Sequence, residues 1–466
     1  MELLFPSISV LFAFLLFMFM VVKVFKRFKA KNPTAKLPPG PWQLPLIGNM
    51  HQLVGSLPHH ILRDLANKYG PLMHLKLGEV STVIASSPES PKRQLRKICT
   101  IELLSPKRVQ TFRSIREEEV LSLIRSISST AKSPINFSKK IYDLTYGITA
   151  RSAFGEKIED QEAFISLMEE AFQLLGGFSI ADMYPSVKVL SVISGLRPRL
   201  EKMHKKIDQI LENIINQHKK GEKTTKHEVE DLVDVLLKFR KHGDLEFTLT
   251  DNNIKAVILD IFSAGSDTSS TAVEWAMSEM LRNPRVMKRA QAEVREVFGK
   301  NGIVDETGLP ELKYLNSVIK ETLRLHPPAP LLLPRECSEQ CEINGYQIPV
   351  KTRVIVNAWA IGRDPRYWTE AERFHPERFL NSPMDFKGID FEYIPFGAGR
   401  RICPGVLFAL PNIELPLAQL LYHFDWKLPT GLKEEKLDMN EAFGLTVRRR
   451  HDLYLIPIPY YPTPVE

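Results

Sequence analysis

Apolar residues recur at spacings of three and four positions along most of the chain between Arg93 and about Phe298, where prolines are few. This spacing aligns apolar side chains on one face of a helix, so it predicts a series of amphipathic helices. Lys202–His218 and Val229–Phe239 are clear cases, and Lys255–Leu281 predicts one long helix. The expected fold class is mainly α with small β-sheets.

Short strands are predicted on either side of this helical region. His74–Leu77 and Thr82–Ala85 flank a Gly78-Glu79 turn, which predicts an early hairpin. The later elements are expected as loops and strands over Pro327–Phe379 with a β-branched run at Arg353–Asn357, a helix over Leu407–Leu421, and a strand and tail over Thr446–Pro457.

The N-terminus carries a long apolar run, Leu3–Val22, which has the length of a membrane-spanning helix. A basic cluster follows it, and positive residues stay on the cytosolic side of a membrane, so the remainder of the chain should face the cytosol. Leu37-Pro38-Pro39-Gly40-Pro41 cannot form a helix and predicts a stiff extended segment. The predicted organisation is an anchor with its basic segment (1–31), a proline-rich hinge (32–45) and one large domain (46–466).

Composition and charge exclude some classes of function. The chain has 44% hydrophobic and 25% charged residues and a formal net charge of +7, which is ordinary for a globular protein of 466 residues. No basic stripe with interleaved aromatic residues occurs, so nucleic acid is not an expected partner. Four cysteines are too few for a disulfide scaffold, and Cys337 and Cys341 lack the two-residue separation that is usual for zinc ligands.

The fourth cysteine, Cys403, lies in Phe396-Gly397-Ala398-Gly399-Arg400-Arg401-Ile402-Cys403-Pro404-Gly405, directly before a predicted helix. Glycines allow close backbone approach to a flat ligand. A helix N-terminus and backbone N–H groups stabilise a thiolate, which is the form of cysteine that binds metals. Arg401 suits an anionic carboxylate. Without further context, such a loop is also compatible with a buried turn.

Two further motifs precede this loop. Glu321 and Arg324 lie three residues apart on a predicted helix, Leu312–Leu325, and Phe374-His375-Pro376-Glu377-Arg378-Phe379 follows downstream. From the spacing alone, Glu321 and Arg324 would be an ordinary surface pair. Ala264-Gly265-Ser266-Asp267-Thr268-Ser269 interrupts the long helix with small polar residues, which can bend a helix through side-chain hydrogen bonds to its backbone.

Together these motifs resemble those of the cytochrome P-450 superfamily: the loop fits F-x-x-G-x-R-x-C-x-G, and the others fit E-x-x-R, P-E-R-F and [AG]-G-x-[DE]-T-[TS]. Further short segments, such as Leu46-Ile47-Gly48-Asn49, resemble plant microsomal members, closest to subfamily D of the plant family numbered 71. The resemblance implies the cytochrome P-450 fold with one N-terminal transmembrane helix in the endoplasmic reticulum membrane.

The resemblance also implies roles for individual residues. Cys403 would be the proximal thiolate ligand of the iron of haem b, Thr268 would steady bound dioxygen, and Asp267 would relay protons through water. Glu321, Arg324 and Arg378 would form a buried structural network. The other residues implied to surround the haem are Arg401, Arg335 and Arg96 at the propionates, Phe396, Gly397, Gly399 and Gly405 in the cysteine loop, and Ala264 and Gly265 over the haem face.

The implied activity is a monooxygenase that inserts one oxygen atom from dioxygen into an apolar small molecule, such as a terpenoid. Electrons would come from NADPH through a membrane-bound reductase. Asp267-Thr268 disfavours a same-fold enzyme that rearranges oxygenated lipids without dioxygen. A non-catalytic haem-binding variant and, if the loop is a coincidence, a soluble helical scaffold remain alternatives. The substrate, the carbon attacked and the oligomeric state are not specified by the sequence.

Two departures from the family pattern stand out. After Ser86-Ser87-Pro88-Glu89 the family normally continues for a few dozen residues before the motif W-x-x-x-R, whose Arg is matched by Arg96 while Lys92 replaces the Trp. The chain is therefore compatible with a splice variant, a mis-joined gene model or an inactive relative. The second departure is Pro411 inside the helix after Cys403, where proline typically costs about 3 kcal/mol.

Overall fold

The computed structural model describes residues 37–85, 100, 103–156, 161–176, 179–187, 189–220, 230–242, 249–299, 302–429 and 433–460. The predicted anchor (1–31), the first part of the hinge and Arg96 lie outside the described residues. Among the residues that are described, no helix is both long and apolar enough to cross a membrane.

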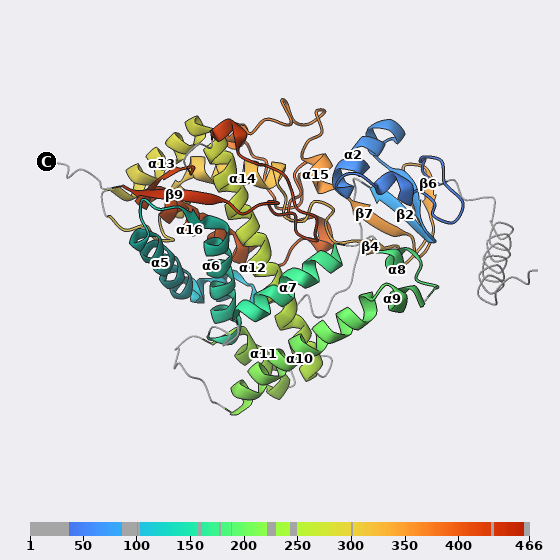
Figure 1. Cartoon of the computed structure of the whole chain (residues 1–466), viewed down its shortest axis with the longest axis horizontal. Coiled ribbons are helices and arrows are strands. Elements are labelled where there is room, and N and C mark those ends of the chain that lie inside the picture. The colour runs from blue at the N-terminus through green and yellow to red at the C-terminus, as the bar shows by residue number, and fades with distance from the viewer. Residues whose placement is uncertain are drawn as a thin grey trace, which may run out of the picture. The chain divides into compact units, whose positions relative to one another are not determined.

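The chain forms two compact units (Figure 1). The first comprises residues 37–85, Met183–Ser186 and Pro334–Ile355, and the second comprises the described residues of Ser86–Asp182, Val187–Leu333 and Val356–Glu466. The prediction of one large domain over 46–466 stays a prediction.

The first unit is built on short strands. Its elements are η1 (Met50–Leu53), α2 (Pro58–Tyr69), β1 (Met73–Leu77), β2 (Val80–Ala85), β4 (Arg335–Glu336), β5 (Cys341–Ile343), β6 (Tyr346–Ile348) and most of β7 (Arg353–Val356). The early hairpin is confirmed, since β1 pairs antiparallel with β2 from Met73↔Ile84 to Leu77↔Val80. The sheet order is β1-β2-β7-β4, and β5 and β6 pair separately.

The described part of the proline-rich hinge is bound to this unit. Pro39 O accepts a hydrogen bond of 2.9 Å from the His74 N–H, and the Asn49 side-chain amide donates to Pro41 O and Trp42 O at 3.2 and 2.9 Å. The carbonyls of this extended segment, which have no helical partner, therefore accept hydrogen bonds from β1 and from the Asn49 side chain.

The second unit is mainly helical, as predicted. Its helices are α4 (Pro106–Thr111), α5 (Arg113–Ser129), α6 (Phe137–Phe154), α7 (Gln161–Leu175), α9 (Val189–Ile193), α10 (Leu196–Lys220), α11 (Leu232–His242), α12 (Asp251–Arg282), α13 (Pro284–Gly299), α14 (Lys313–Leu325), α15 (Ala358–Ile361) and α16 (Val406–His423), with α8 (Ile180–Met183) shared between the units. The 3₁₀ turns are η3 (Leu309–Glu311), η4 (Pro376–Phe379), η5 (Gly399–Arg401) and η6 (Glu434–Lys436), and a small sheet has the order β3-β9-β8, with β3 (Ile135–Asn136), β8 (Phe424–Lys427) and β9 (Tyr454–Pro459).

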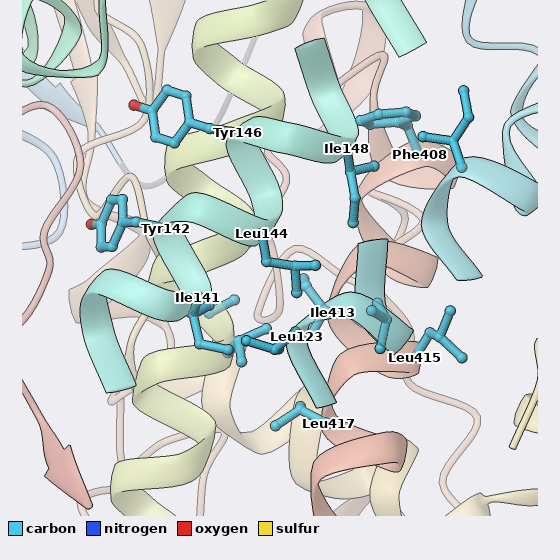
Figure 2. Close-up of a cluster of buried hydrophobic side chains, with 14 of the residues drawn as sticks. Leu123, Ile141, Tyr142, Leu144, Tyr146, Ile148, Phe408, Ile413, Leu415 and Leu417 are labelled. Atoms are coloured by element: carbon cyan, nitrogen blue, oxygen red, sulfur yellow. The ribbon is translucent and has the colours of Figure 1, made fainter. Parts of the chain in front are cut away.

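Helix α12 is the longest described helix and the centre of the second unit. Thr250 caps its N-terminus in a reciprocal capping box with Asn253. Helices α6 and α16 pack along it, and the apolar side chains between α5, α6 and α16 form part of one continuous core (Figure 2). Every residue from Ser269 to Leu281 is buried, so the second half of α12 is enclosed by protein.

The predicted C-terminal strand is shorter than expected. Strand β9 begins at Tyr454, whereas Thr446–Leu453 is irregular. The reason is that backbone groups before β9 bond to distant loops and helices instead of a strand: the Leu445 N–H donates to Phe172 O at 3.1 Å, and the Val447 N–H donates to Pro328 O at 2.8 Å.

Candidate active site

Cys403 lies in a tight loop that ends where α16 begins. Gly397 and Gly399 adopt φ angles of +72° and +62°, a region that side chains rarely enter, which explains glycine at both positions. The Cys403 N–H donates to Phe396 O at 2.8 Å and closes the loop. The Gly405 N–H then donates to the Cys403 sulfur at 3.3 Å, close to the start of α16 at Val406. This donor and the nearby helix N-terminus stabilise negative charge on the sulfur.

Helix α12 has an open face next to its buried half. Ala264 is exposed and Thr268, one turn later, is half-buried, although their neighbours Phe262 and Ser266 are buried. The Thr268 hydroxyl donates to Ala264 O at 2.6 Å, as the small polar motif predicts for side-chain bonding to the helix backbone. The exposed positions Ala256, Asp260 and Ala264 follow one another at four-residue spacing, so Ala264 and Thr268 lie at the end of an open face that precedes the buried half of the helix.

Gly265 faces protein. A Cβ at this position would lie 3.3 Å from Phe408 on α16 and 3.5 Å from Thr149 on α6. The absence of a side chain at Gly265 therefore lets α12 approach α6 and α16 closely, and its expected role over the haem face stays a prediction.

Asp267 is buried, with 3% of its surface exposed. Burial raises the pKa of its carboxyl, and the hydroxyls of Thr446 and Tyr142 and the cationic Arg448 lower it in part. Tyr142 and Arg448 were not identified from the sequence. No signal in the sequence indicated their position, because their proximity to α12 depends on how distant segments pack.

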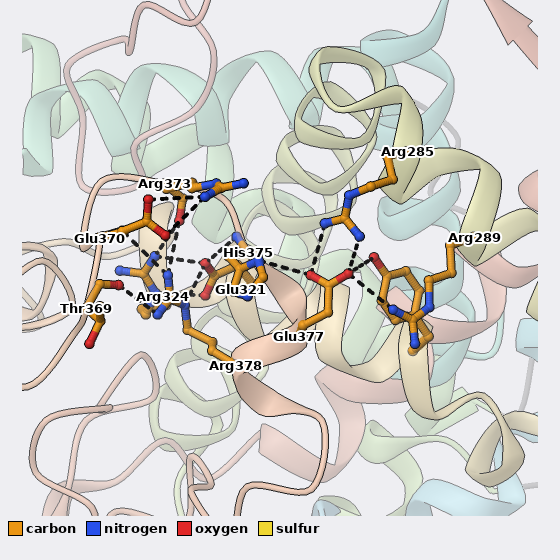
Figure 3. Close-up of polar contacts among 11 residues, drawn as sticks. Arg285, Arg289, Glu321, Arg324, Thr369, Glu370, Arg373, His375, Glu377 and Arg378 are labelled. Atoms are coloured by element: carbon orange, nitrogen blue, oxygen red, sulfur yellow. Dashed lines mark hydrogen bonds and ion pairs between the residues drawn. The ribbon is translucent and has the colours of Figure 1, made fainter.

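Glu321, Arg324 and Arg378 are brought together in one buried network (Figure 3). Arg324 donates to both carboxylate oxygens of Glu321 at 2.8 and 2.9 Å, and Arg378 Nε donates to Glu321 Oε1 at 3.0 Å. Arg324 also donates to the carbonyls of Gly362 and Ala371 at 2.5 and 2.7 Å. The network joins α14 to η4 and to the loop that precedes it.

A second charged cluster beside it centres on Glu377, the Glu of the P-E-R-F segment, and was not identified from the sequence. Its carboxylate accepts hydrogen bonds from Arg285 on α13, from Arg289 at 3.2 Å and from the Tyr314 hydroxyl at 3.1 Å (Figure 3). The hydrogen bonds from Arg285 are the main cause that lowers the pKa of Glu377 to about 2. The segment 374–379 therefore connects two helices: Arg378 contacts Glu321 of α14, and Glu377 contacts Arg285 of α13.

The expected propionate partners are distributed over the chain. Arg401 is exposed in η5, two residues before Cys403. Arg335 belongs to the first unit, where β4 places it opposite Val354 of β7. Arg96 lies outside the described residues.

Comparisons with known proteins agree with these motifs. The family model described as Cytochrome P450 matches residues 38–93 and 89–454. Cytochrome P450 71D10 from Glycine max is 56% identical over 500 residues (97% of this chain and 97% of the relative). Premnaspirodiene oxygenase from Hyoscyamus muticus is 49% identical over 502 residues (98% and 99%). Tabersonine 16-hydroxylase 2 from Catharanthus roseus is 55% identical over 497 residues (96% and 97%).

The solved structure of a zebra fish cytochrome P450 with abiraterone matches with a TM-score of 0.70 at 24% identity, covering 87% of this chain and all of that chain. This match shows the fold.

The same comparisons locate a gap. The two stretches that match the family model meet at residues 89–93, where a missing segment is expected. The 500 aligned positions of the Glycine max relative cover only 97% of a 466-residue chain, so several dozen of them are positions at which this chain has no residue. The chain spans nearly the whole length of its relatives without an internal segment that they contain.

The chain belongs to the cytochrome P450 family, whose members are monooxygenases.

Proposed function

We propose that this chain binds haem b through Cys403 and inserts one oxygen atom from dioxygen into an apolar small molecule. The single observation that carries the proposal is the Gly405 N–H donating to the Cys403 sulfur at the start of α16. A sulfur held in this way can remain a thiolate ligand, and when haem is bound to a thiolate it supplies the electron-rich iron that favours O–O cleavage.

The residues present fit a haem. The cysteine loop uses two glycines with positive φ, and a Cβ at Gly405 would lie 3.8 Å from the Cys403 sulfur, so glycine at this position leaves space beside the sulfur. Arg401, exposed near the thiol, has the charge and geometry for a propionate carboxylate, and Arg335 and Arg96 are proposed to contribute in the same way. On α12, Ala264 offers the exposed small residue that a flat ligand needs for close approach.

Thr268 and Asp267 are the proposed catalytic residues. The half-buried Thr268 hydroxyl lies on the open face of α12, where it can hydrogen-bond to a bound reactant. The buried carboxyl of Asp267 has a raised pKa, which favours a form that carries a transferable proton.

The proposed substrates are apolar plant metabolites. Premnaspirodiene oxygenase, at 49% identity, and tabersonine 16-hydroxylase 2, at 55%, support terpenoids and alkaloids as the two candidate substrate classes. Residues 1–31 are proposed to anchor the chain in the endoplasmic reticulum membrane with the catalytic part in the cytosol. Electrons are proposed to come from NADPH through a reductase in the same membrane.

The test is turnover in microsomes that contain the full chain and a plant NADPH-dependent reductase. Terpene hydrocarbons and indole alkaloids would be supplied with isotope-labelled dioxygen. A product that gains one labelled oxygen atom, requires NADPH and is absent with Cys403→Ser is the expected result. A Cys341→Ser variant controls for loss of a thiol elsewhere. Haem-loaded protein that gives no product with any substrate class would contradict monooxygenase activity and favour a catalytically impaired variant.

A further inference from the structure

His218, Asp231 and Asp234 form a cluster where two helices of the second unit meet. His218 lies in the last turn of α10, Asp231 directly precedes α11, and Asp234 lies in the first turn of α11 (Figure 1). The ring nitrogen or carboxylate oxygen that each residue offers lies within 4.8 Å of those of the other two. The proposed monooxygenase reaction uses none of these residues.

Each ring nitrogen of His218 faces an oxygen atom. Nδ1 lies 2.7 Å from the backbone carbonyl oxygen of Ile214, and Nε2 lies 3.0 Å from Asp231 Oδ2. A carbonyl oxygen can only accept a hydrogen bond, so Nδ1 carries a proton and Nε2 is the nitrogen that faces the carboxylate. A nitrogen lone pair and a carboxylate oxygen at this distance need a cation between them. That cation is either a proton or a metal ion.

The second polar atom of each buried group is already held in place. The Nδ1–H of His218 donates to Ile214 O, as the non-ligating nitrogen of a metal-bound histidine usually does to a backbone carbonyl. Asp231 Oδ1 accepts the Asp234 N–H at 2.9 Å. The side chains of His218 and Asp231 are only 5% and 2% exposed. His218 Nε2 and Asp231 Oδ2 are therefore two oriented ligand atoms, and the half-buried Asp234 supplies a third that solvent can reach.

Gly155, at the C-terminal end of α6, leaves room next to the Asp231 carboxylate. A Cβ at this position would lie 2.9 Å from Asp231 Oδ2, which is too close for a side chain. The φ angle of +79° already favours glycine here, and the missing side chain also keeps space beside the oxygen that faces His218. An ion can therefore be accommodated at this oxygen.

We propose that His218, Asp231 and Asp234 form a zinc-binding site that holds the end of α10 to the start of α11. One imidazole and two carboxylates suit zinc, which binds nitrogen and oxygen ligands at about 2.0–2.2 Å. Two ligand atoms of one such ion lie up to about 4.3 Å apart, so small side-chain rotations close the cluster around it. Zinc takes the place of the proton on Nε2, and water completes its coordination.

Magnesium and calcium prefer sites made of oxygen ligands, so they compete poorly for a site that contains an imidazole. The inference goes beyond the proposed function and does not depend on it.

The experiment measures the zinc that the purified, haem-loaded full chain without a histidine tag binds in equilibrium dialysis. The wild type should retain one zinc ion per chain in the presence of millimolar magnesium. Asp234→Asn removes one ligand and leaves the buried His218–Asp231 pair intact, so it should weaken zinc binding at least about tenfold. His218→Gln should weaken it further. His204→Gln changes an exposed histidine on the same helix and is the matched control, which should bind zinc as the wild type does.

X-ray absorption at the zinc edge identifies the ligands. We expect nitrogen and oxygen neighbours with an imidazole signal, and no sulfur at about 2.3 Å, the length of a zinc–thiolate bond. Sulfur ligands would assign the zinc to cysteines and overturn the inference. A wild type that retains no zinc, or an affinity that is the same in the wild type and in Asp234→Asn, would overturn it as well.

If His218→Gln does not fold, thermal unfolding of Asp234→Asn gives the decision. Zinc that binds only the folded chain raises the melting temperature, so added zinc should raise that of the wild type and of His204→Gln but not that of Asp234→Asn. An equal rise in all three proteins would place the zinc elsewhere and refute the site.

Discussion

Arg324 donates hydrogen bonds to both carboxylate oxygens of Glu321, and both side chains are fully buried. A buried pair of this kind is strongly destabilising to break, at about 3–5 kcal/mol, because the remaining charge is left uncompensated. Arg324 would lose its counter-ion in Glu321→Gln, and Arg378 would lose the carboxylate that it contacts at 3.0 Å.

We therefore predict that Glu321→Gln unfolds at a much lower denaturant concentration than the wild type and incorporates little haem. Glu370→Gln is the control, since Glu370 pairs with Arg373 and both side chains are mostly exposed, at 59% and 60%. That variant should change the free energy of unfolding by less than about 0.5 kcal/mol. Equal stability of the two variants would show that the buried network does not hold the fold together.

Glu274 gives the protein a pH dependence of the opposite sign from that of an ordinary carboxylate. Burial raises its pKa to about 7, even though Ser138 and Arg449 favour its charged form. The folded state then binds more protons than the unfolded state between about pH 4.5 and 7, so the free energy of unfolding falls as pH rises through this window.

Glu274→Gln should remove the contribution of Glu274 to the slope of the free energy of unfolding against pH. Relative to the wild type, the variant should gain on the order of 2 kcal/mol at pH 8 and little at pH 5. Denaturant unfolding at both pH values measures the difference. Glu414, whose pKa burial also raises to about 7, should leave a residual slope in the variant. A difference that is the same at both pH values would contradict the raised pKa of Glu274.

The pH dependence of stability that comes from Glu377 has the sign that is usual for a carboxylate. Its hydrogen bonds from Arg285 lower its pKa to about 2, so its contribution to stability is present above the unfolded-state pKa and is lost as pH falls toward about 2. Glu377→Gln should therefore be less stable than the wild type near neutral pH, and the gap should close on acidification. A gap that persists in acid would mean that the variant acts by another route, such as lost packing against Tyr314.

Pro411 interrupts the hydrogen bonds of α16, yet the helix continues from Val406 to His423 through both Pro411 and Pro416. Because proline lacks an N–H, it leaves one carbonyl of the preceding turn without its helical donor. We expect Pro411→Ala to stabilise the protein by about 1–3 kcal/mol, measured by denaturant unfolding at neutral pH. Destabilisation would mean that the helix is shaped around this proline.

The sequence predicted the helices and the early hairpin because their apolar periodicity is local information. It also predicted the cysteine loop and the buried glutamate–arginine pair, but only through long motifs: spacing alone described Glu321 and Arg324 as a surface pair. Burial is a tertiary property, and nothing in the periodicity of α14 indicates which loops cover it.

The surroundings of Asp267 could not be predicted for the same reason. Tyr142, Glu169 and Arg448 are separated by long stretches of chain, and they meet only because α6, α7 and the segment before β9 pack around α12. Likewise, the sequence did not indicate that Phe408 on α16 and Thr149 on α6 would be the neighbours of Gly265. The strand expected from Thr446 is shortened because long-range hydrogen bonds occupy the backbone at Leu445 and Val447.

Cys403 is proposed to be the thiolate ligand of a haem in a chain that lacks an internal segment of its relatives. The most direct measurement is the ferrous–carbon monoxide difference spectrum of the full chain in microsomes, compared with Cys403→Ser and Cys337→Ser. We expect the red-shifted Soret band of a thiolate-ligated haem in the wild type and in Cys337→Ser, and its loss in Cys403→Ser. A wild-type protein without haem, or with the unshifted band, would contradict it.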